Sequence, residues 1–192
     1  MKLKDSISSY RQPNFWVNSD DPRIEVLAQG LASAESAYRY VRDQIHHSFD
    51  VQAEEAPGTA REVLEAGHGL CFAKSHLLAA ILRAMRIPSG MVYQRLLLGN
   101  TPDEGYCLHG LNAIYDASRD RWFRVDARGN RPGIEAEFSA TTEQLAFTVQ
   151  DNLGEIAYDL IYAQPPQCIQ DFYRSNPVGV SVMCRTLPSE LE

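Results

Sequence analysis

The sequence predicts an α+β fold in a single domain, because two different apolar patterns follow one another along the chain. Apolar residues recur with helical spacing over about residues 21–86, and then alternate with a period of two over about residues 90–127. Helices first and strands second, with polar turns between the strands, indicate helices packed against a mostly antiparallel sheet. The length of 192 residues is enough for one domain with its own core.

Two helices are expected in the first quarter of the chain. Asp21-Pro22 is a helix start, because the carboxylate caps free N–H groups and proline fits the first helical position. This helix should run to about Gln29. Ser33 then caps a second helix, whose apolar residues fall on one face. They are Ala34, Ala37, Tyr38, Val41 and Ile45.

Two more helices are expected before the strands. The stretch Thr59–Glu62 is a capping box, and Gly67 suits the left-handed position that closes a two-turn helix over about 60–66. An amphipathic helix should follow over Cys71–Arg86 and stop before Pro88, since proline cannot continue it.

Three strands are expected over 90–98, 107–115 and 121–127, the last two joined by the polar turn 116–120. The expected elements beyond them are short. They are a loop at 128–133, a strand toward Phe138, a helix start at 141–144, a strand within 155–163 and a helix over 165–173. The ends are expected to be an arm or edge strand over 1–20, and an edge strand, a dimer contact or loose chain over 178–192.

The composition indicates a cytoplasmic globular protein. The net charge of −7 and pI of about 5.2 disfavour nucleic acid and anionic membranes as partners. We expect neither a secretory signal nor a membrane span, because no long apolar run is present. Four scattered cysteines indicate reduced thiols rather than a disulfide framework. The oligomeric state is left open.

Cys71, His109 and Asp126 are the candidate catalytic residues. Cys71 should open a helix, whose free N–H groups and dipole stabilise a thiolate and could also hold an oxyanion. His109 and Asp126 fall on consecutive predicted strands. A cysteine, a base and an orienting carboxylate form the arrangement used for acyl transfer through a thioester.

The predicted hairpin brings the histidine and the aspartate together. The residue numbers of His109 and Asp126 sum to 235, so a register that pairs them directly has its centre between Ala117 and Ser118, inside the predicted turn. Directly opposed residues share a face, with Cβ atoms about 4.5 to 5.5 Å apart. The carboxylate would then accept the ring N–H and leave the other ring nitrogen toward Cys71.

Several stretches together resemble the transglutaminase-like superfamily, most closely its bacterial members. They are Gly69-Leu-Cys71-Phe-Ala73, the helix end Leu82-Arg-Ala-Met-Arg-Ile-Pro88, His109 on a strand, Trp122-Phe-Arg-Val-Asp126, Val41–Asp50 and Asp126–Asn130. The resemblance covers about residues 34–150. We expect residues 1–192 to form one such domain, with a core over about 34–150, an N-terminal arm and short helix over 1–33 and a C-terminal extension over 151–192.

The resemblance implies a papain-like α+β fold with the cysteine helix packed on an antiparallel sheet. It also implies that Cys71 is the nucleophile, His109 the general base and acid, and Asp126 the orienting carboxylate. The chain departs from the common pattern at two places: Phe72 stands where tryptophan is frequent, and His109-Gly-Leu replaces His-Ala-Trp. These departures concern the walls of the acyl channel rather than the three reacting residues.

Four further residues are candidates for substrate or oxyanion binding. Gln94 is a polar residue in an otherwise apolar strand, either a second oxyanion donor or a solvent-facing side chain. His68 is either a polar edge of the site or a solvated residue. Arg128 and Asn130 follow Asp126 on a glycine-containing loop and either grip a substrate carboxylate or amide or form a polar turn.

A structural zinc site is the metal-binding alternative. His68, Cys71, Cys107 and His109 would supply two cysteines and two histidines, but the pairs lie on different elements and the metal would consume both reacting residues. We therefore expect no metal and no cofactor. The remaining cysteines are expected to be buried thiols and the other histidines to pack, face water or interact with a helix end. These are Cys107, Cys168, Cys184, His46, His47 and His76.

The sequence thus predicts a cysteine-dependent enzyme that transfers or hydrolyses the acyl group of a peptide, protein or small amide substrate. Whether water or an amine resolves the thioester is left open. The alternative is a catalytically silent domain of the same fold that binds peptides or assembles with a partner.

Overall fold

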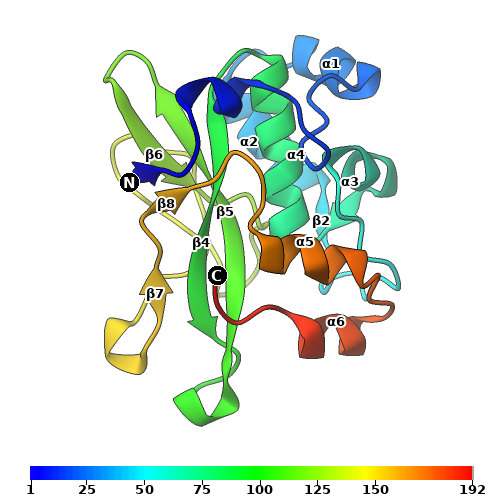
Figure 1. Cartoon of the computed structure of the whole chain (residues 1–192), viewed down its shortest axis with the longest axis vertical. Helices are drawn as coiled ribbons and strands as arrows, with labels where there is room; N and C mark the ends of the chain where they lie inside the picture. The colour runs from blue at the N-terminus through cyan, green and yellow to red at the C-terminus, as the bar shows by residue number, and fades with distance from the viewer. Residues whose placement is uncertain (192) are drawn as a thin grey trace.

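The fold is built on a four-stranded antiparallel sheet with the order β6–β5–β4–β7 (Figure 1). The computed structural model describes residues 1–191. The two central strands are β4 (Ser89–Leu97) and β5 (Tyr106–Asp116), with β6 (Arg121–Val125) and the short β7 (Ile156–Ala157) on either side. The expected α+β class with an antiparallel sheet is confirmed.

The central helix is α4 (Cys71–Ala84), which packs against the sheet and against three other helices (Figure 1). These are α1 (Pro22–Gln29), α2 (Ala34–Gln44) and α3 (Ala60–Ala66). Every residue from Cys71 to Arg83 is buried. The helix is therefore enclosed on all sides, and the expectation of an amphipathic helix with a solvent-facing side is wrong.

Four polar side chains of α4 are buried because backbone carbonyls accept their hydrogen bonds, among them Ser75, which donates to the carbonyl of Phe72 over 2.6 Å. Lys74 donates from Nζ to the carbonyl of Ile45, and the His76 ring donates from Nδ1 to the carbonyl of Gly58 over 2.7 Å. Arg83 donates to carbonyl groups at Ser89, Gln12 and Ala163 over 2.7–3.1 Å. A polar group that keeps its hydrogen bonds can be buried at modest cost.

The caps read from the sequence are present at the first three helices. The Asp21 carboxylate accepts a hydrogen bond from the N–H of Arg23, and the Ser33 hydroxyl accepts one from the N–H of Ser36. At α3, Thr59 and Glu62 form the expected capping box, and Gly67 closes the helix with φ of 71°. Capping signals involve residues only three positions apart, so they can be read locally.

Helix α4 ends two residues before the expected Arg86. Arg86 has φ of 63°, and the N–H of Ile87 donates to the carbonyl of Leu82 over 2.8 Å, while the N–H of Arg86 donates to Arg83 over 2.8 Å. These two bonds define a Schellman motif, which satisfies the last carbonyls of the helix before Pro88.

Residues 128–150 contain neither the strand expected toward Phe138 nor the helix expected at 141–144. The hydroxyl of Ser139 accepts hydrogen bonds from the N–H groups of Thr141 and Thr142, which stabilises a local turn in place of a helix start. Only isolated bridges occur in the segment, between Arg131 and Ile134 and between Glu137 and Gln144. Near its end the segment instead contacts the central strand β5 through side-chain packing.

Several short strands and 3₁₀ helices complete the fold. Two small parallel pairs form, β1 (Lys2–Leu3) with β8 (Leu160–Ile161) and β2 (His46–His47) with β3 (His68–Gly69). Short 3₁₀ helices occur at Ile7–Arg11, Pro102–Glu104 and Asp151–Leu153.

The C-terminal region adds two helices below α4 (Figure 1). Helix α5 (Gln167–Arg174) confirms the expected helix, whereas α6 (Val180–Thr186) lies where an edge strand or loose chain was expected. The chain then returns to the sheet, since the N–H of Leu108 donates to the carbonyl of Pro188 over 2.7 Å. Within the described residues, no helix is long and apolar enough to cross a membrane.

Candidate active site

Cys71 is the first residue of α4, with its sulfur beside strand β5. The residue before it, Leu70, has extended backbone and provides no side-chain cap, so the N–H groups of the first turn have no capping side chain. The N–H of Gly110 donates to Cys71 Sγ over 3.4 Å, and Cys71 is 9% exposed. The thiol therefore lies at the positive end of the helix dipole with backbone donors around it.

The close contact between α4 and β5 depends on Gly110. A Cβ atom at this position would lie 2.8 Å from Cδ1 and 3.0 Å from Cα of Phe72, distances that require one of the two elements to shift. The two departures from the common family pattern, Phe72 and Gly110, are thus in contact. The aromatic ring and the missing side chain together let the helix start approach the histidine strand.

His109 and Asp126 are joined by a hydrogen bond of 2.7 Å between Nε2 and Oδ2. The expected register is nevertheless wrong by two residues: Asn112 pairs with Val125, whose numbers sum to 237 rather than 235. A shift of two residues keeps every side chain on the same face, so the pair still meets. Asp126 lies just beyond β6 and reaches back to His109 rather than opposing it.

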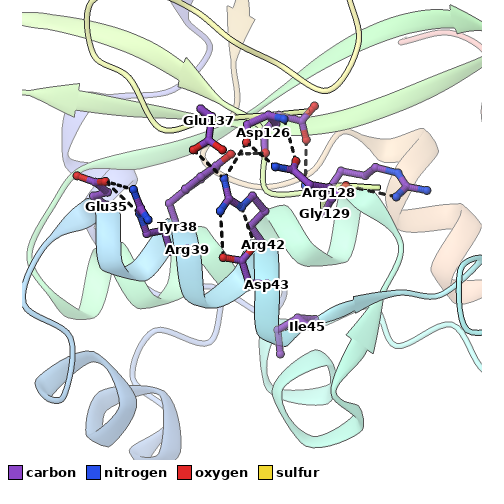
Figure 2. A network of polar contacts seen from close by, with 12 residues as sticks. Glu35, Tyr38, Arg39, Arg42, Asp43, Ile45, Asp126, Arg128, Gly129 and Glu137 are labelled. Atoms are coloured by element: carbon purple, nitrogen blue, oxygen red, sulfur yellow. Dashed lines mark hydrogen bonds and ion pairs between the residues drawn. The ribbon is translucent and has the colours of Figure 1, made fainter. Parts of the chain in front are cut away.

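The Asp126 carboxylate is fully buried and has three donors. Oδ2 accepts from His109 and from the N–H of Ala146 at 3.2 Å, and Oδ1 accepts from the N–H of Arg128 at 3.0 Å. Figure 2 shows Tyr38 of α2 reaching Asp126, whose backbone carbonyl accepts the Tyr38 hydroxyl at 3.0 Å. A carboxylate held at both oxygens has a fixed orientation toward its histidine.

The protonation of the pair is set by opposing effects. Burial of His109 disfavours the imidazolium, but the negative charge of Asp126, the nearby Cys71 sulfur and hydrogen bonds to both raise the pKa of His109 to about 10. Burial would raise the pKa of Asp126, but His109 and the two backbone donors outweigh it and lower that pKa. The pair is therefore charged at neutral pH.

Two residues that the sequence reasoning missed lie over His109, in the irregular segment after β6. The ring of Phe147 packs edge-on against the imidazole with centroids 4.9 Å apart, and Ala146 supplies the backbone donor to Asp126. No local pattern in the sequence pointed to them, because their contacts are with residues some 20 to 38 positions earlier.

Gln94 is placed beside His109, directly opposed to it in the β4–β5 pair. It is 2% exposed, so the solvent-facing interpretation, one of the two that the sequence allowed, is wrong. Its Nε2 donates to the carbonyl of Phe147 over 3.3 Å, whereas its buried Oε1 has no hydrogen-bond partner among the described residues. An unpaired buried oxygen next to the histidine is costly unless a ligand donates to it.

The structure does not bring the other three candidates to the thiol as free binding groups. Arg128 is 6% exposed, and its guanidinium is bonded at two points to Asp50. The side chain of Asn130 bonds to both the N–H and the carbonyl of Ala136, which closes its loop. His68 lies on β3 with Nδ1 bonded to the hydroxyl of Ser48 at 3.1 Å.

The structure does not support the alternative of a structural zinc site. Among residues 1–191, no group of three or more His, Cys, Asp or Glu side chains is arranged to hold a metal ion. No disulfide joins any of the four cysteines, all of which lie among the described residues. Cys107 is half-buried, with burial raising the pKa of its thiol to about 12, and Cys168 is also half-buried. Cys184 is exposed, contrary to the expectation of a buried thiol.

These features define an α+β protein with a cysteine at a helix N-terminus facing a buried histidine–aspartate pair. The family model of the transglutaminase-like superfamily matches residues 24–127. The chain belongs to this superfamily. No curated protein matches the sequence.

Two solved structures are similar to this chain at low sequence identity. A protein of Cytophaga hutchinsonii, assigned provisionally as a cysteine protease, has a TM-score of 0.50 and 17% identity, over 64% of this chain and 42% of that chain. The periplasmic domain of TgpA from Pseudomonas aeruginosa has a TM-score of 0.45 and 17% identity, over 65% of this chain and 48% of that one. The chain thus spans less than half the length of these structures.

Proposed function

We propose that this protein is a cysteine-dependent hydrolase or acyltransferase that acts on amide bonds through a Cys71–His109–Asp126 triad. The observation that carries the proposal is the buried His109–Asp126 bond of 2.7 Å beside a thiol at the N-terminus of α4. The candidate substrates are a peptide, a protein or a small amide. Neither nucleic acid nor membrane is part of the proposal.

The proposed reaction begins from the ion pair in which His109 already holds the proton of the Cys71 thiol. The thiolate attacks the carbonyl carbon, a C–S bond forms, and the carbonyl electrons move to oxygen. When the oxyanion collapses, the C–N bond breaks and the amine leaves with the proton from His109. Water or a second amine then attacks the thioester and restores the thiol.

Two groups are suited to assist these steps. The N–H groups at the start of α4, which has no side-chain cap, would stabilise the oxyanion, where the loss of one such donor typically costs about 10²–10³ in rate. The Gln94 amide lies beside His109 with an unpaired oxygen, which we propose accepts a hydrogen bond from the substrate amide or the leaving amine.

Acylation of Cys71 by p-nitrophenyl acetate, a small activated ester, tests the proposal with no need for the natural substrate. We expect a burst of p-nitrophenolate and an acetyl group that peptide mass mapping locates on Cys71. The burst should be lost in Cys71→Ala and kept in Cys184→Ala, a matched control at an exposed cysteine. Added hydroxylamine or methylamine would show whether an amine competes with water for the thioester.

Acetylation spread over several cysteines, with no burst, would contradict the proposal. The silent peptide-binding or assembly domain would then be the better description of this chain.

A further inference from the structure

We propose that Asp50 is a positioning residue, which clamps the loop after β6 so that Asp126 stays aligned with His109. The inference rests on the proposed function, because it concerns the geometry of the same site. Asp50 follows β2 and lies some 76 positions from Asp126 in the sequence. It has no hydrogen bond to Cys71, His109 or Asp126 among the described residues and acts through Arg128.

The clamp consists of two successive contacts. The Arg128 guanidinium donates to both oxygens of Asp50, over 2.7 Å from Nη1 and 3.0 Å from Nη2. The backbone N–H of the same Arg128 donates to Oδ1 of Asp126 over 3.0 Å. A two-point arginine–carboxylate contact fixes orientation as well as distance, so the Arg128 backbone is held where Asp126 needs its donor. Figure 2 shows Arg128 leaving the Asp126 loop with its side chain extended away from the carboxylate.

Burial makes this pair different from the surface ion pairs of the chain. The Arg128 side chain is 6% exposed and that of Asp50 is 31% exposed, whereas Arg39 and Glu35 are 57% and 46% exposed. Exposed ion pairs contribute little to the stability of a fold. Removing one member of a buried pair, in contrast, leaves an uncompensated buried charge. The buried guanidinium would then lie unneutralised beside the His109–Asp126 pair.

Other charged groups face the same region from three elements. Arg131, on the same loop as Arg128, also donates to Asp50, over 3.1 Å. His47 on β2 is 7% exposed and kept uncharged, because burial and the nearby Arg128 lower its pKa. Lys74 of α4 is buried near Arg128, and burial lowers its pKa to about 7. Asp50 is therefore the carboxylate that pairs directly with both Arg128 and Arg131.

The rate of Cys71 alkylation by iodoacetamide, measured from pH 5 to 9, tests the clamp. In Asp50→Asn, both the loosened loop and the unbalanced Arg128 charge destabilise the His109 imidazolium, which supports the thiolate. We expect the acid limb of the labelling profile to move up by about one pH unit, so that labelling at pH 6 falls about tenfold. Asp50→Glu, which keeps the charge, should restore part of the rate.

Asp43→Asn is the matched control. Asp43 also pairs with an arginine near the end of α2, but that arginine, Arg42, is additionally held by Glu137 and the carbonyl of Ala136 (Figure 2). This variant loses the same charge without loosening the Asp126 loop, and it should label like the wild type. A uniform loss of rate with no shift in the profile would show a merely structural role and overturn the clamp.

Two outcomes separate the clamp from the proposed function. If wild-type Cys71 does not label rapidly below pH 7, the proposed function fails. If wild-type Cys71 labels rapidly and Asp50→Asn gives the same profile, only the clamp fails. If Asp50→Asn does not fold, Arg128→Lys tests the clamp instead. Lysine keeps the positive charge but cannot form the two-point contact with Asp50. A wild-type profile in that variant would also overturn the clamp.

Discussion

His109 shows how two opposing effects set the charge of one side chain. The imidazole is 5% exposed, and burial alone would favour its neutral form. The charge of Asp126 and the nearby Cys71 sulfur outweigh burial and raise its pKa to about 10. Since each pKa unit corresponds to about 1.4 kcal/mol, the site stabilises the imidazolium by several times the thermal energy. In the proposed reaction, the proton that the leaving amine takes from His109 would therefore be in place at neutral pH.

Asp126→Asn should remove most of the stabilisation of the His109 imidazolium. Burial would remain while the main opposing charge is lost, so the pKa of His109 should fall and the alkaline limb of the turnover profile should move to lower pH. We expect turnover of p-nitrophenyl acetate at pH 8 to drop at least about 10²-fold, the usual contribution of a general acid–base group. Asp116→Asn, on the same hairpin and paired with Arg119, is the control. An unchanged alkaline limb would contradict the role of Asp126.

At the scale of the elements, the contact between α4 and β5 sets the position of the Cys71 thiol relative to His109. Gly110 lets the first turn of α4 approach the strand, and the same residue donates its N–H to Cys71 Sγ. The position of the thiol relative to His109 thus depends on the absence of one methyl group.

Gly110→Ala should displace the start of α4. The new Cβ would overlap Phe72, and overpacking of this kind typically costs about 1–3 kcal/mol of unfolding free energy. We expect a lower midpoint in urea unfolding together with slower labelling of Cys71. Gly30→Ala is the control, because its Cβ would meet nothing closer than 3.4 Å. Equal stability and equal labelling in the two variants would show that the close approach is unimportant.

The same elements show what the sequence could and could not predict. Helices α1 to α3 were predictable because their caps lie within three residues of one another, and β4 to β6 because polar loops and turns separate their apolar stretches. Cys71, His109 and Asp126 followed from their places on these elements. The pairing register of β5 and β6 could not be predicted, because a hairpin can be centred at more than one position within the polar turn at 116–120.

The segment 128–150 could not be predicted for a different reason. Its conformation is fixed by contacts with Asp126, His109 and Gln94, all distant in sequence. The proposed role of Asp50 could not be predicted for the same reason. It depends on a contact with Arg128, which is distant in sequence and which the local pattern indicates only as part of a polar loop.

At the scale of the whole molecule, burial of uncharged histidines makes stability depend on pH. His76 is fully buried, and burial lowers its pKa to about 4. Burial also lowers the pKa values of His47 and His68. For a base whose pKa is lower in the folded state, the unfolded chain binds more protons, so stability falls as the pH falls below about 6.5. Acid should therefore destabilise this protein before most of its carboxylates are protonated.

His76→Gln should reduce this acid sensitivity. Glutamine cannot become charged, and its amide can still donate to the carbonyl of Gly58. Between pH 7 and pH 4 we expect the wild type to lose about 3 kcal/mol more unfolding free energy than the variant, the value that corresponds to the lowered pKa of His76. Urea unfolding at both pH values measures the difference. Equal losses would show that His76 is not the group responsible.

The most direct test of the central claim, that His109 activates Cys71, is mass-mapped iodoacetamide labelling across pH 5 to 9 in the wild type and in His109→Ala. We predict that wild-type Cys71 labels rapidly below pH 7, well ahead of the other three cysteines, and that His109→Ala loses this reactivity. If Cys71 labels no faster than Cys107, or if its rate below pH 7 is the same without His109, the claim is contradicted.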